Sequence, residues 1–274
     1  CIEVNIYMKL GIIGCGNMAG SMLTQMLVNG FVQKEDVMAS AYHEKRRKQL
    51  RERYGIAVTD DNVEVAQDAD ILLIGVKPQE YRNIIMEIRS VVKPETLVIA
   101  IAVGVTMDGI KDLFGKPVRL TRAMPNIAAQ VGEGVTGFCT NFYVTDEDKE
   151  IIVHALESFG KAIEVAEKDL EVVSSIGSAA PAFVYIMIEA LADGAVAEGL
   201  KRDLAYQFAS QMVLGSGLLV RDGGIHPGTW KDMVCSPGGT TIEGVSVLEE
   251  KGFRSALIQA IRACVKKSHT VADQ

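Results

Sequence analysis

An apolar segment near the start of the chain runs directly into a glycine-rich turn: residues 9–20 read KLGIIGCGNMAG. This order predicts a strand, a tight turn and a helix. In such a turn Gly14 permits the sharp change of direction, Gly16 lets the backbone approach a pyrophosphate, and Ala19 is the small residue where helix packs on strand. The first amides of the helix would point at the phosphates. We therefore predict a dinucleotide site here, rather than a plain strand–turn–helix corner.

Short β-rich segments alternate with helical ones from Met8 to about Ala166. The strands are expected at residues 10–13, 37–41, 70–76, 96–101, 118–123, 135–139 and 162–165. Apolar strands separated by helices indicate a parallel sheet that is covered on both faces. We predict an α/β fold whose N-terminal domain, residues 8–166, is Rossmann-like, doubly wound and mostly parallel.

The pattern changes after Glu167, where strand signals end. Helices are expected at residues 183–200, 203–221, 241–251 and 253–267, which predicts an all-helical second domain over residues 167–274. About a hundred residues of apolar helix are few for an independent core. We expect the surplus apolar faces to pack against a second copy, giving a homodimer or a higher homo-oligomer built from dimers. The alternative is that they pack on the first domain.

Composition excludes several classes of partner. The net charge of −7 over 274 residues argues against nonspecific binding to nucleic acid or to anionic membranes. The five cysteines are scattered and the four histidines are isolated, so we expect no disulfide framework, no metal site and a cytoplasmic location. No unbroken apolar run approaches the length of a membrane span. Residues 1–7 lack a basic segment typical of signal peptides, and Met8 is the expected natural start.

The end of the second predicted strand should set the cofactor type. An NAD site usually has a carboxylate there to bind the ribose 2′-hydroxyl. Here Glu44 comes late and the cations Lys45, Arg46 and Arg47 follow it. This favours NADPH, with NADH as the alternative. The cations could instead belong to a solvated first helical turn with i,i+4 charge pairs.

Three further turns follow predicted strands at the same sheet edge: residues 76–78 (VKP), 102–104 (AVG) and 124–126 (MPN). Together they would make one wall of a cofactor site, although each alone is an ordinary turn. Asn62 could reach the adenosine side or could cap a helix. Cys15 would lie close to the phosphates, where a thiol can be reactive; we favour a small space-filling role.

A second sharp feature precedes the third predicted helix of the C-terminal half, where residues 236–241 read SPGGTT. Backbone amides at such a helix start form a concavity that fits a small carboxylate. The equally good alternative is a loop with an N-cap threonine and Glu243 in the first turn. No nucleophile system stands out, and hydride transfer from a cofactor needs none.

With these motifs the chain resembles the pyrroline-5-carboxylate reductases from residue 8 to about residue 267. The most specific match is the stretch 236–241, with GFR at 252–254 behind it; residues 14–19, 76–78, 124–126 and 189–194 also fit. The resemblance implies reduction of the cyclic imine Δ1-pyrroline-5-carboxylate to L-proline by NADPH or NADH. It also implies a helical dimerisation domain, with the active site near the interface of two subunits.

The turns and the resemblance together assign the site residues. Those expected to contact the cofactor are Gly14, Cys15, Gly16, Asn17, Met18, Ala19, Asn62, Val76, Lys77, Pro78, Ala102, Val103 and Asn126. Those that the resemblance places at the substrate are Glu167, Ser236, Gly238, Gly239, Thr240 and Thr241. It implies that the loop amides hold the carboxylate and that the Thr241 hydroxyl faces the imine nitrogen.

Two departures from the family pattern leave alternatives open. The glycine-serine stretch before the long helix reads GSAAPAF at residues 177–183, with Ala179 and Ala180 adding methyl groups, and Met233 replaces an asparagine of some members. Ala179 and Ala180 keep a catalytically silent NADP(H)-sensing protein as one alternative, and a reductase for another small cyclic imine carboxylate is a separate alternative. A β-hydroxyacid dehydrogenase would carry lysine and asparagine after this turn, and residues 177–191 contain neither.

Overall fold

The computed structural model describes residues 8–101 and 104–272. Its sheet has eight strands in the order β3-β2-β1-β4-β5-β6-β7-β8. The strands are β1 (Leu10–Ile13), β2 (Val37–Ser40), β3 (Ala57–Thr59), β4 (Ile71–Ile74), β5 (Leu97–Ala100), β6 (Arg119–Met124), β7 (Gly134–Thr140) and β8 (Gly160–Glu164). All pairs are parallel except β6 with β7. The mostly parallel sheet is confirmed, and the short edge strand β3 was missed.

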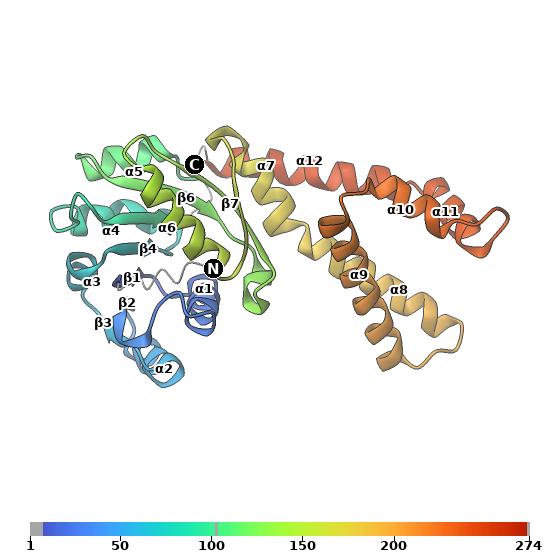
Figure 1. Cartoon of the computed structure of the whole chain (residues 1–274), viewed down its shortest axis with the longest axis horizontal. Coiled ribbons are helices and arrows are strands. Elements are labelled where there is room, and N and C mark those ends of the chain that lie inside the picture. The colour runs from blue at the N-terminus through green and yellow to red at the C-terminus, as the bar shows by residue number, and fades with distance from the viewer. Residues whose placement is uncertain (1–7, 102–103, 273–274) are drawn as a thin grey trace. The chain divides into compact units, whose positions relative to one another are not determined.

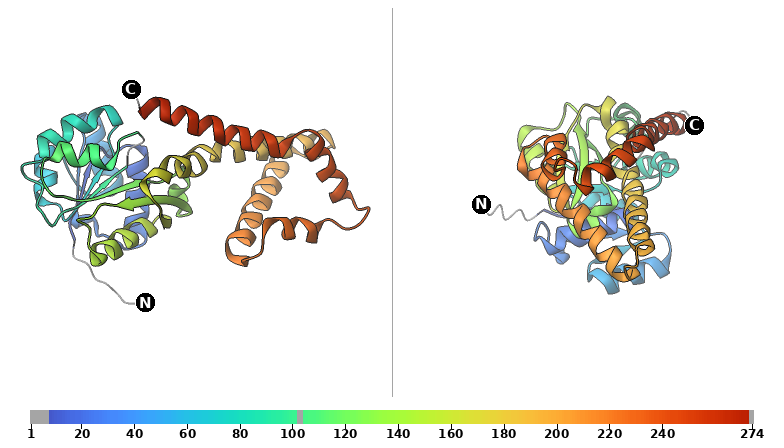
Figure 2. Two further views of the ribbon diagram at one scale, coloured as in Figure 1. Left: turned by 90° about the horizontal axis from the view of Figure 1, so that it is seen from above. Right: turned by 90° about the vertical axis from the view of Figure 1, so that its right-hand side faces the viewer.

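Helices cover both faces of this sheet (Figures 1 and 2). One apolar cluster includes side chains of α1 (Asn17–Val28), α2 (Glu44–Tyr54) and α6 (Asp146–Glu157). The other includes side chains of α3 (Asn62–Asp68), α4 (Tyr81–Ile88), α5 (Met107–Phe114) and α7 (Leu170–Ser174). The short 3-10 helices are η1 (Lys34–Asp36), η2 (Pro78–Glu80), η3 (Ile127–Val131) and η4 (Glu167–Asp169). This three-layer arrangement confirms the Rossmann-like fold class.

The strand order places a topological switch point at β1. From β1 the chain pairs outward to β2 on one side and to β4 on the other, in register from Leu10 to Ile13. In doubly wound sheets, ligands bind in the crevice outside the carboxyl ends of the strands at such a point. The glycine-rich turn follows β1 directly, so the fold puts it at the mouth of that crevice.

The C-terminal part of the chain is helical, as predicted. A π-helical turn (Ser175–Ala179) leads to α8 (Pro181–Ala197), α9 (Arg202–Gly223), α10 (Pro227–Val234), α11 (Thr240–Glu250) and α12 (Phe253–Ala272). The short α7 and α10 were missed. The chain divides into two compact units: Cys1–Ser178 with Val265–Gln274, and Ala179–Cys264. The domain limits 8–166 and 167–274 remain a prediction.

Within the second unit, α8 and α9 pack on each other yet leave many large apolar side chains exposed. These include Tyr185, Ile186, Phe208 and Leu214. The helical stretch Glu167–Ala197 also has the length and hydropathy of a membrane span, with 11% of its most apolar window buried. The sequence analysis had found no unbroken apolar run of this length, because a few polar residues interrupt the stretch. A single helix of this kind is weak evidence that the chain spans a membrane. Helices that pack their apolar side chains on another protein chain have a similar composition.

Candidate functional site

A cleft of about 770 Å³ lies at the carboxyl ends of β1, β2 and β4. It is lined by the glycine-rich turn (residues 14–16), by residues 40–42 after β2 and by residues 75–77 after β4. Asn62 and Arg46 complete the side nearest β2. Its position is the switch-point crevice that a dinucleotide occupies in this class of fold.

The two glycines of the turn differ in what surrounds them. Gly14 has φ +83°, and a Cβ there would lie 2.5 Å from Cγ1 of Val76 and 2.9 Å from the carbonyl carbon of Gly75. A Cβ on Gly16 would meet nothing within 4 Å. Gly14 is therefore required by the fold itself, whereas Gly16 leaves open space facing the cleft.

The first backbone amides of the helix after the turn are free of side-chain caps. Gly16 is the N-cap of α1, no side chain caps this end, and its first turn holds no acidic residue. Uncapped amides at a helix start favour an anion. Ala19 is buried and would lie 3.1 Å from a Cβ on Gly75, so a small residue is needed where helix meets strand. Asn17 lines a neighbouring polar pocket of about 260 Å³.

A series of hydrogen-bonded polar side chains forms one side of the cleft at the end of β2. The buried Ser40 hydroxyl donates to Oδ1 of Asn62 at 2.6 Å, and Nδ2 of Asn62 donates to Glu87 at 2.9 Å. The N-cap of α3 is Asp61, which accepts from the amide of Val63 at 2.8 Å. The alternative role of Asn62 as a helix cap is therefore wrong, and its side chain belongs to the cleft.

The charged residues after β2 have separate roles. Arg46 lines the cleft and donates through Nη2 to the carbonyl of Cys15 at 2.8 Å. The Glu44 carboxylate accepts from Arg47 and from Arg51, each at 2.7 Å, and does not line the cleft. The solvated-turn interpretation thus describes Glu44 and Lys45, which are exposed. Arg47 is only 14% exposed and donates to the carbonyls of Ala41 and Tyr42, whereas Arg46 is a cation that lines the ligand crevice.

Cys15 is buried in the wall of the cleft. Burial raises the pKa of its thiol to about 11, and Arg46 and Arg53 only partly oppose this rise. The group is therefore a neutral thiol near pH 7, in agreement with the space-filling role. Among the described residues, no group of three His, Cys, Asp or Glu side chains is arranged to hold a metal ion.

The remaining predicted cofactor residues vary in placement. Val76 and Lys77 line the cleft, whereas Pro78 begins η2 beyond it, and Met18 packs beside the apolar core. The Asn126 side chain is buried and bonds to backbone, donating to Gly177 O at 2.9 Å and accepting from the amide of Val135 at 3.1 Å. Ala102 and Val103 lie outside the described residues.

Glu167 is held by a partner that the sequence analysis missed. Its Oε1 accepts from Nη1 of Arg122 at 2.5 Å and from the amide of Met107 at 2.6 Å. Arg122 is a buried arginine in the middle of β6. The available signal was an arginine within an otherwise mostly apolar strand, since a buried charge in a core strand requires a partner.

The stretch 236–241 consists of the loop before α11 and the first two residues of that helix, in the second unit. Gly239 is the N-cap, no side chain caps the helix, and Glu243 lies in its first turn. Gly238 has φ +67°, and a Cβ on Gly239 would lie 2.3 Å from Oγ of Ser236. The N-cap threonine alternative is therefore wrong, and the amides of Thr240 and Thr241 begin the helix.

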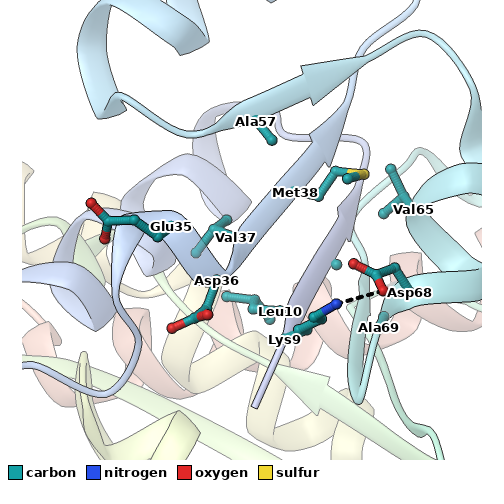
Figure 3. A pocket seen from close by; sticks show the side chains of 11 residues that line it. Lys9, Leu10, Glu35, Asp36, Val37, Met38, Ala57, Val65, Asp68 and Ala69 are labelled. Carbon is teal, nitrogen blue, oxygen red and sulfur yellow. Dashed lines mark hydrogen bonds and ion pairs between the residues drawn. The ribbon is translucent and has the colours of Figure 1, made fainter. Parts of the chain in front are cut away.

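Another pocket lies at the amino ends of β1 and β2 (Figure 3). It measures about 120 Å³ and includes Lys9 and Asp68, which form a largely exposed ion pair at 2.8 Å. Figure 3 shows Glu35 and Asp36 at its side. Since ligands in this class of sheet bind at the carboxyl ends of the strands, this pocket is not the candidate site.

Comparison with known proteins agrees with this geometry. Residues 167–271 match the family model for pyrroline-5-carboxylate reductase dimerisation, and residues 9–104 match that for NADP oxidoreductase, coenzyme F420-dependent. The pyrroline-5-carboxylate reductase of Escherichia coli K12 is 41% identical over 96% of this chain and 98% of its own length. That of Methanosarcina acetivorans is 37% identical, with 95% and 96% covered.

Solved structures give the same result. The pyrroline-5-carboxylate reductase of Coxiella burnetii superposes with a TM-score of 0.90 at 29% identity, covering 97% of this chain and 98% of that one. The Plasmodium falciparum pyrroline carboxylate reductase with NADP bound gives a TM-score of 0.87 at 28% identity, with the same coverage. On these similarities, the chain belongs to the pyrroline-5-carboxylate reductase family.

Proposed function

We propose that this chain reduces Δ1-pyrroline-5-carboxylate to L-proline with NADPH as the hydride donor. The observation that carries the proposal is the cleft built on residues 14–16 at the switch point of the sheet. The names of the relatives support the substrate, and the NADP in the Plasmodium falciparum structure supports the cofactor.

The residues at the cleft fit NADPH. Open space beside Gly16 and the uncapped start of α1 suit a pyrophosphate, which needs close backbone approach and amide donors. Ser40 and Asn62 supply polar groups for the adenosine side. Arg46 supplies a cation, and the Glu44 carboxylate that would repel a 2′-phosphate is turned to other arginines.

The substrate side is proposed at the start of α11. Bound NADPH supplies the hydride for the C=N carbon. The amides of Thr240 and Thr241 bind the carboxylate of the imine, and the loop that exposes them is closed by the Gly239 amide, which donates to Ser236 O at 3.0 Å. The Thr241 hydroxyl hydrogen-bonds the ring nitrogen and passes it a proton as the imine becomes an amine, and the hydroxyl recovers that proton from solvent water. Orientation of the two reactants contributes several kcal/mol of the acceleration.

The decisive experiment follows oxidation of NADPH, and then of NADH, by the purified protein with racemic Δ1-pyrroline-5-carboxylate. Fast, saturable oxidation with a higher kcat/KM for NADPH is expected. Tight NADPH binding without turnover would contradict the proposed reaction and favour the sensing alternative. Turnover only with other cyclic imine carboxylates would replace the substrate and leave the reaction class intact.

Arg46 should set the preference for NADPH. We expect Arg46→Met to lower kcat/KM for NADPH about 10- to 100-fold, because it removes charge-assisted hydrogen bonds to a phosphate. The value for NADH should change much less. Lys48→Met is the matched control, since Lys48 lies on the same helix beside Glu52 and does not line the cleft. Equal losses with both cofactors would rule out recognition of the 2′-phosphate.

We also propose that the chain forms a homodimer, which the dimerisation family model and the exposed apolar side chains of α8 and α9 support. The four free cysteines among the described residues support a location in the cytoplasm. Phe208 on α9 is 70% exposed, and Phe208→Glu should convert dimer to monomer in sedimentation equilibrium. Phe142→Glu is the control, because Phe142 is 96% exposed between β7 and α6 in the first unit. An unchanged mass for Phe208→Glu would remove this face from the interface.

A further inference from the structure

An exposed aromatic side chain lines the cofactor cleft just after β2. Tyr42 is 87% exposed and, among the described residues that line this cleft, it is the one aromatic. It lies two residues after the end of β2 and directly before His43, the N-cap of α2. A ring that stays in water buries little apolar surface, so Tyr42 adds little to the stability of the fold.

Tyr42 does not have the structural role that is usual at its position. An apolar residue just before an N-cap commonly packs on the fourth residue of the helix. In α2 that residue is Arg47, whose guanidinium donates to the carbonyl oxygens of Ala41 at 3.0 Å and of Tyr42 at 2.8 Å. Arg47 also pairs with Glu44 and Asp60. These contacts fix the backbone that carries the ring, while the ring itself stays outside the fold.

The ring is further held by its neighbour along the chain. The ring centroids of Tyr42 and His43 are 5.0 Å apart, and the ring planes meet at 82°. Perpendicular contacts of this kind are favourable between aromatic rings. The amide of Ala41 donates to Thr59 O at 3.1 Å, which ties the same loop to β3. The loop therefore presents a preorganised ring, whose binding to a ligand costs little ordering.

The order of the cofactor's parts along the cleft determines what meets this ring. With NADPH bound as proposed, the pyrophosphate lies at residues 14–16 and the adenosine ribose lies at the carboxyl end of β2. That strand ends at Ser40. The base is attached to this ribose on the side away from the pyrophosphate, so it meets the lining residues that follow β2. Of these, Tyr42 offers a flat ring.

We infer that the Tyr42 ring is the stacking surface for the adenine base of the cofactor. The inference rests on the proposed function and deepens it. Arg46 binds the 2′-phosphate that only NADPH carries, whereas Tyr42 binds the base that NADPH and NADH share. Stacking uses the face of a base and not its edge, so it adds affinity without selecting between the two cofactors.

The test measures dissociation constants, without imine substrate, for four ligands. They are NADPH, NADH, 2′,5′-ADP and the NADPH analogue whose base is hypoxanthine. Tyr42→Ala should weaken binding of all four by a similar factor, about 5- to 100-fold, the range found for base–aromatic stacking. NADH lacks the 2′-phosphate, 2′,5′-ADP lacks the nicotinamide, and hypoxanthine keeps the face of the base while its edge differs.

Two further variants separate stacking from other effects. Tyr42→Phe keeps the ring and should bind all four ligands as the unsubstituted chain does. Phe142→Ala is the matched control, because Phe142 is an exposed aromatic of the first unit that does not line the cleft. It should leave every dissociation constant unchanged. Thermal unfolding of Tyr42→Ala should give an unchanged Tm, since the ring is not part of the core.

Several results would overturn the inference, each for a stated reason. Unchanged binding in Tyr42→Ala would mean that the ring does not meet the cofactor. A loss for NADPH alone would mean that the substitution acts through Arg46. Unchanged binding of 2′,5′-ADP would place the ring against the nicotinamide. A loss that spares the hypoxanthine analogue, or an equal loss in Tyr42→Phe, would mean a hydrogen bond from the hydroxyl to the edge of the base.

This test and that of the proposed function fail in different ways. Because no imine is present, a chain that binds NADPH without reducing pyrroline-5-carboxylate would contradict the proposed reaction, and the comparison at Tyr42 would still be decided. Absence of NADPH binding in the unsubstituted chain would overturn both at once, before any variant is made.

Discussion

Gly16→Ala is expected to leave the chain fully folded and to weaken NADPH binding at least about 10²-fold, or about 3 kcal/mol. The added methyl group meets no protein atom within 4 Å, and φ at Gly16 is −79°, so the fold tolerates it. The methyl group would instead occupy the space through which the pyrophosphate approaches the backbone. Fluorescence titration with NADPH and thermal unfolding measure the two effects separately.

Gly14→Ala is the matched comparison two residues earlier. It places a Cβ 2.5 Å from Val76 at a positive φ, so strain and overpacking should cost about 2–6 kcal/mol of folding free energy. This variant should lose stability and cofactor binding together. If Gly16→Ala bound NADPH as tightly as the unsubstituted chain, the pyrophosphate would not lie at this turn.

The sequence was most informative where burial is complete. The strands β1, β4 and β5 are uninterrupted apolar segments that are buried along their whole length, so composition alone predicted them. The edge strand β3 has three partly exposed residues and too few side chains to form a periodic pattern. β3 is held as a strand by its backbone pairing with β2, which its sequence pattern alone does not predict.

The length of the connection between β6 and β7 is enough to predict the direction of β7. A parallel connection needs a crossover of a dozen or more residues, usually with a helix. Between Met124 and Gly134 the chain has room only for the short η3. The antiparallel pairing of β6 with β7 follows from this length, although the apolar character of both strands favours neither direction.

Two features of the site could not be predicted from local sequence: which of two adjacent residues caps a helix, and which acidic residue pairs with a buried arginine. Asp61 and Asn62 are adjacent and both are good N-cap residues, so only the structure assigns the cap to Asp61 and the cleft to Asn62. The ion pair of Arg122 and Glu167 spans 45 residues of sequence. The chain contains many acidic residues that could pair with that arginine, and the three-dimensional packing of β6 against η4 selects one.

Thr241→Val should lower kcat for reduction of Δ1-pyrroline-5-carboxylate about 10²-fold, the usual contribution of one positioned proton donor. Gly239 is the N-cap of α11, so the Thr241 hydroxyl is not needed to start the helix, and the exposed side chain tolerates a valine of similar shape. NADPH binding should not change, because that cleft belongs to residues of the first unit.

Two further variants make the Thr241 result interpretable. Thr241→Ser keeps the hydroxyl and should recover most of kcat, whereas Thr229→Val makes the same exchange at an exposed position of α10 and should leave kcat near that of the unsubstituted chain. Full kcat/KM in Thr241→Val would rule out the proposed role. A loss confined to kcat would mean that the hydroxyl acts on the ring nitrogen as the amine forms, since a contact made equally to the bound imine would raise KM instead.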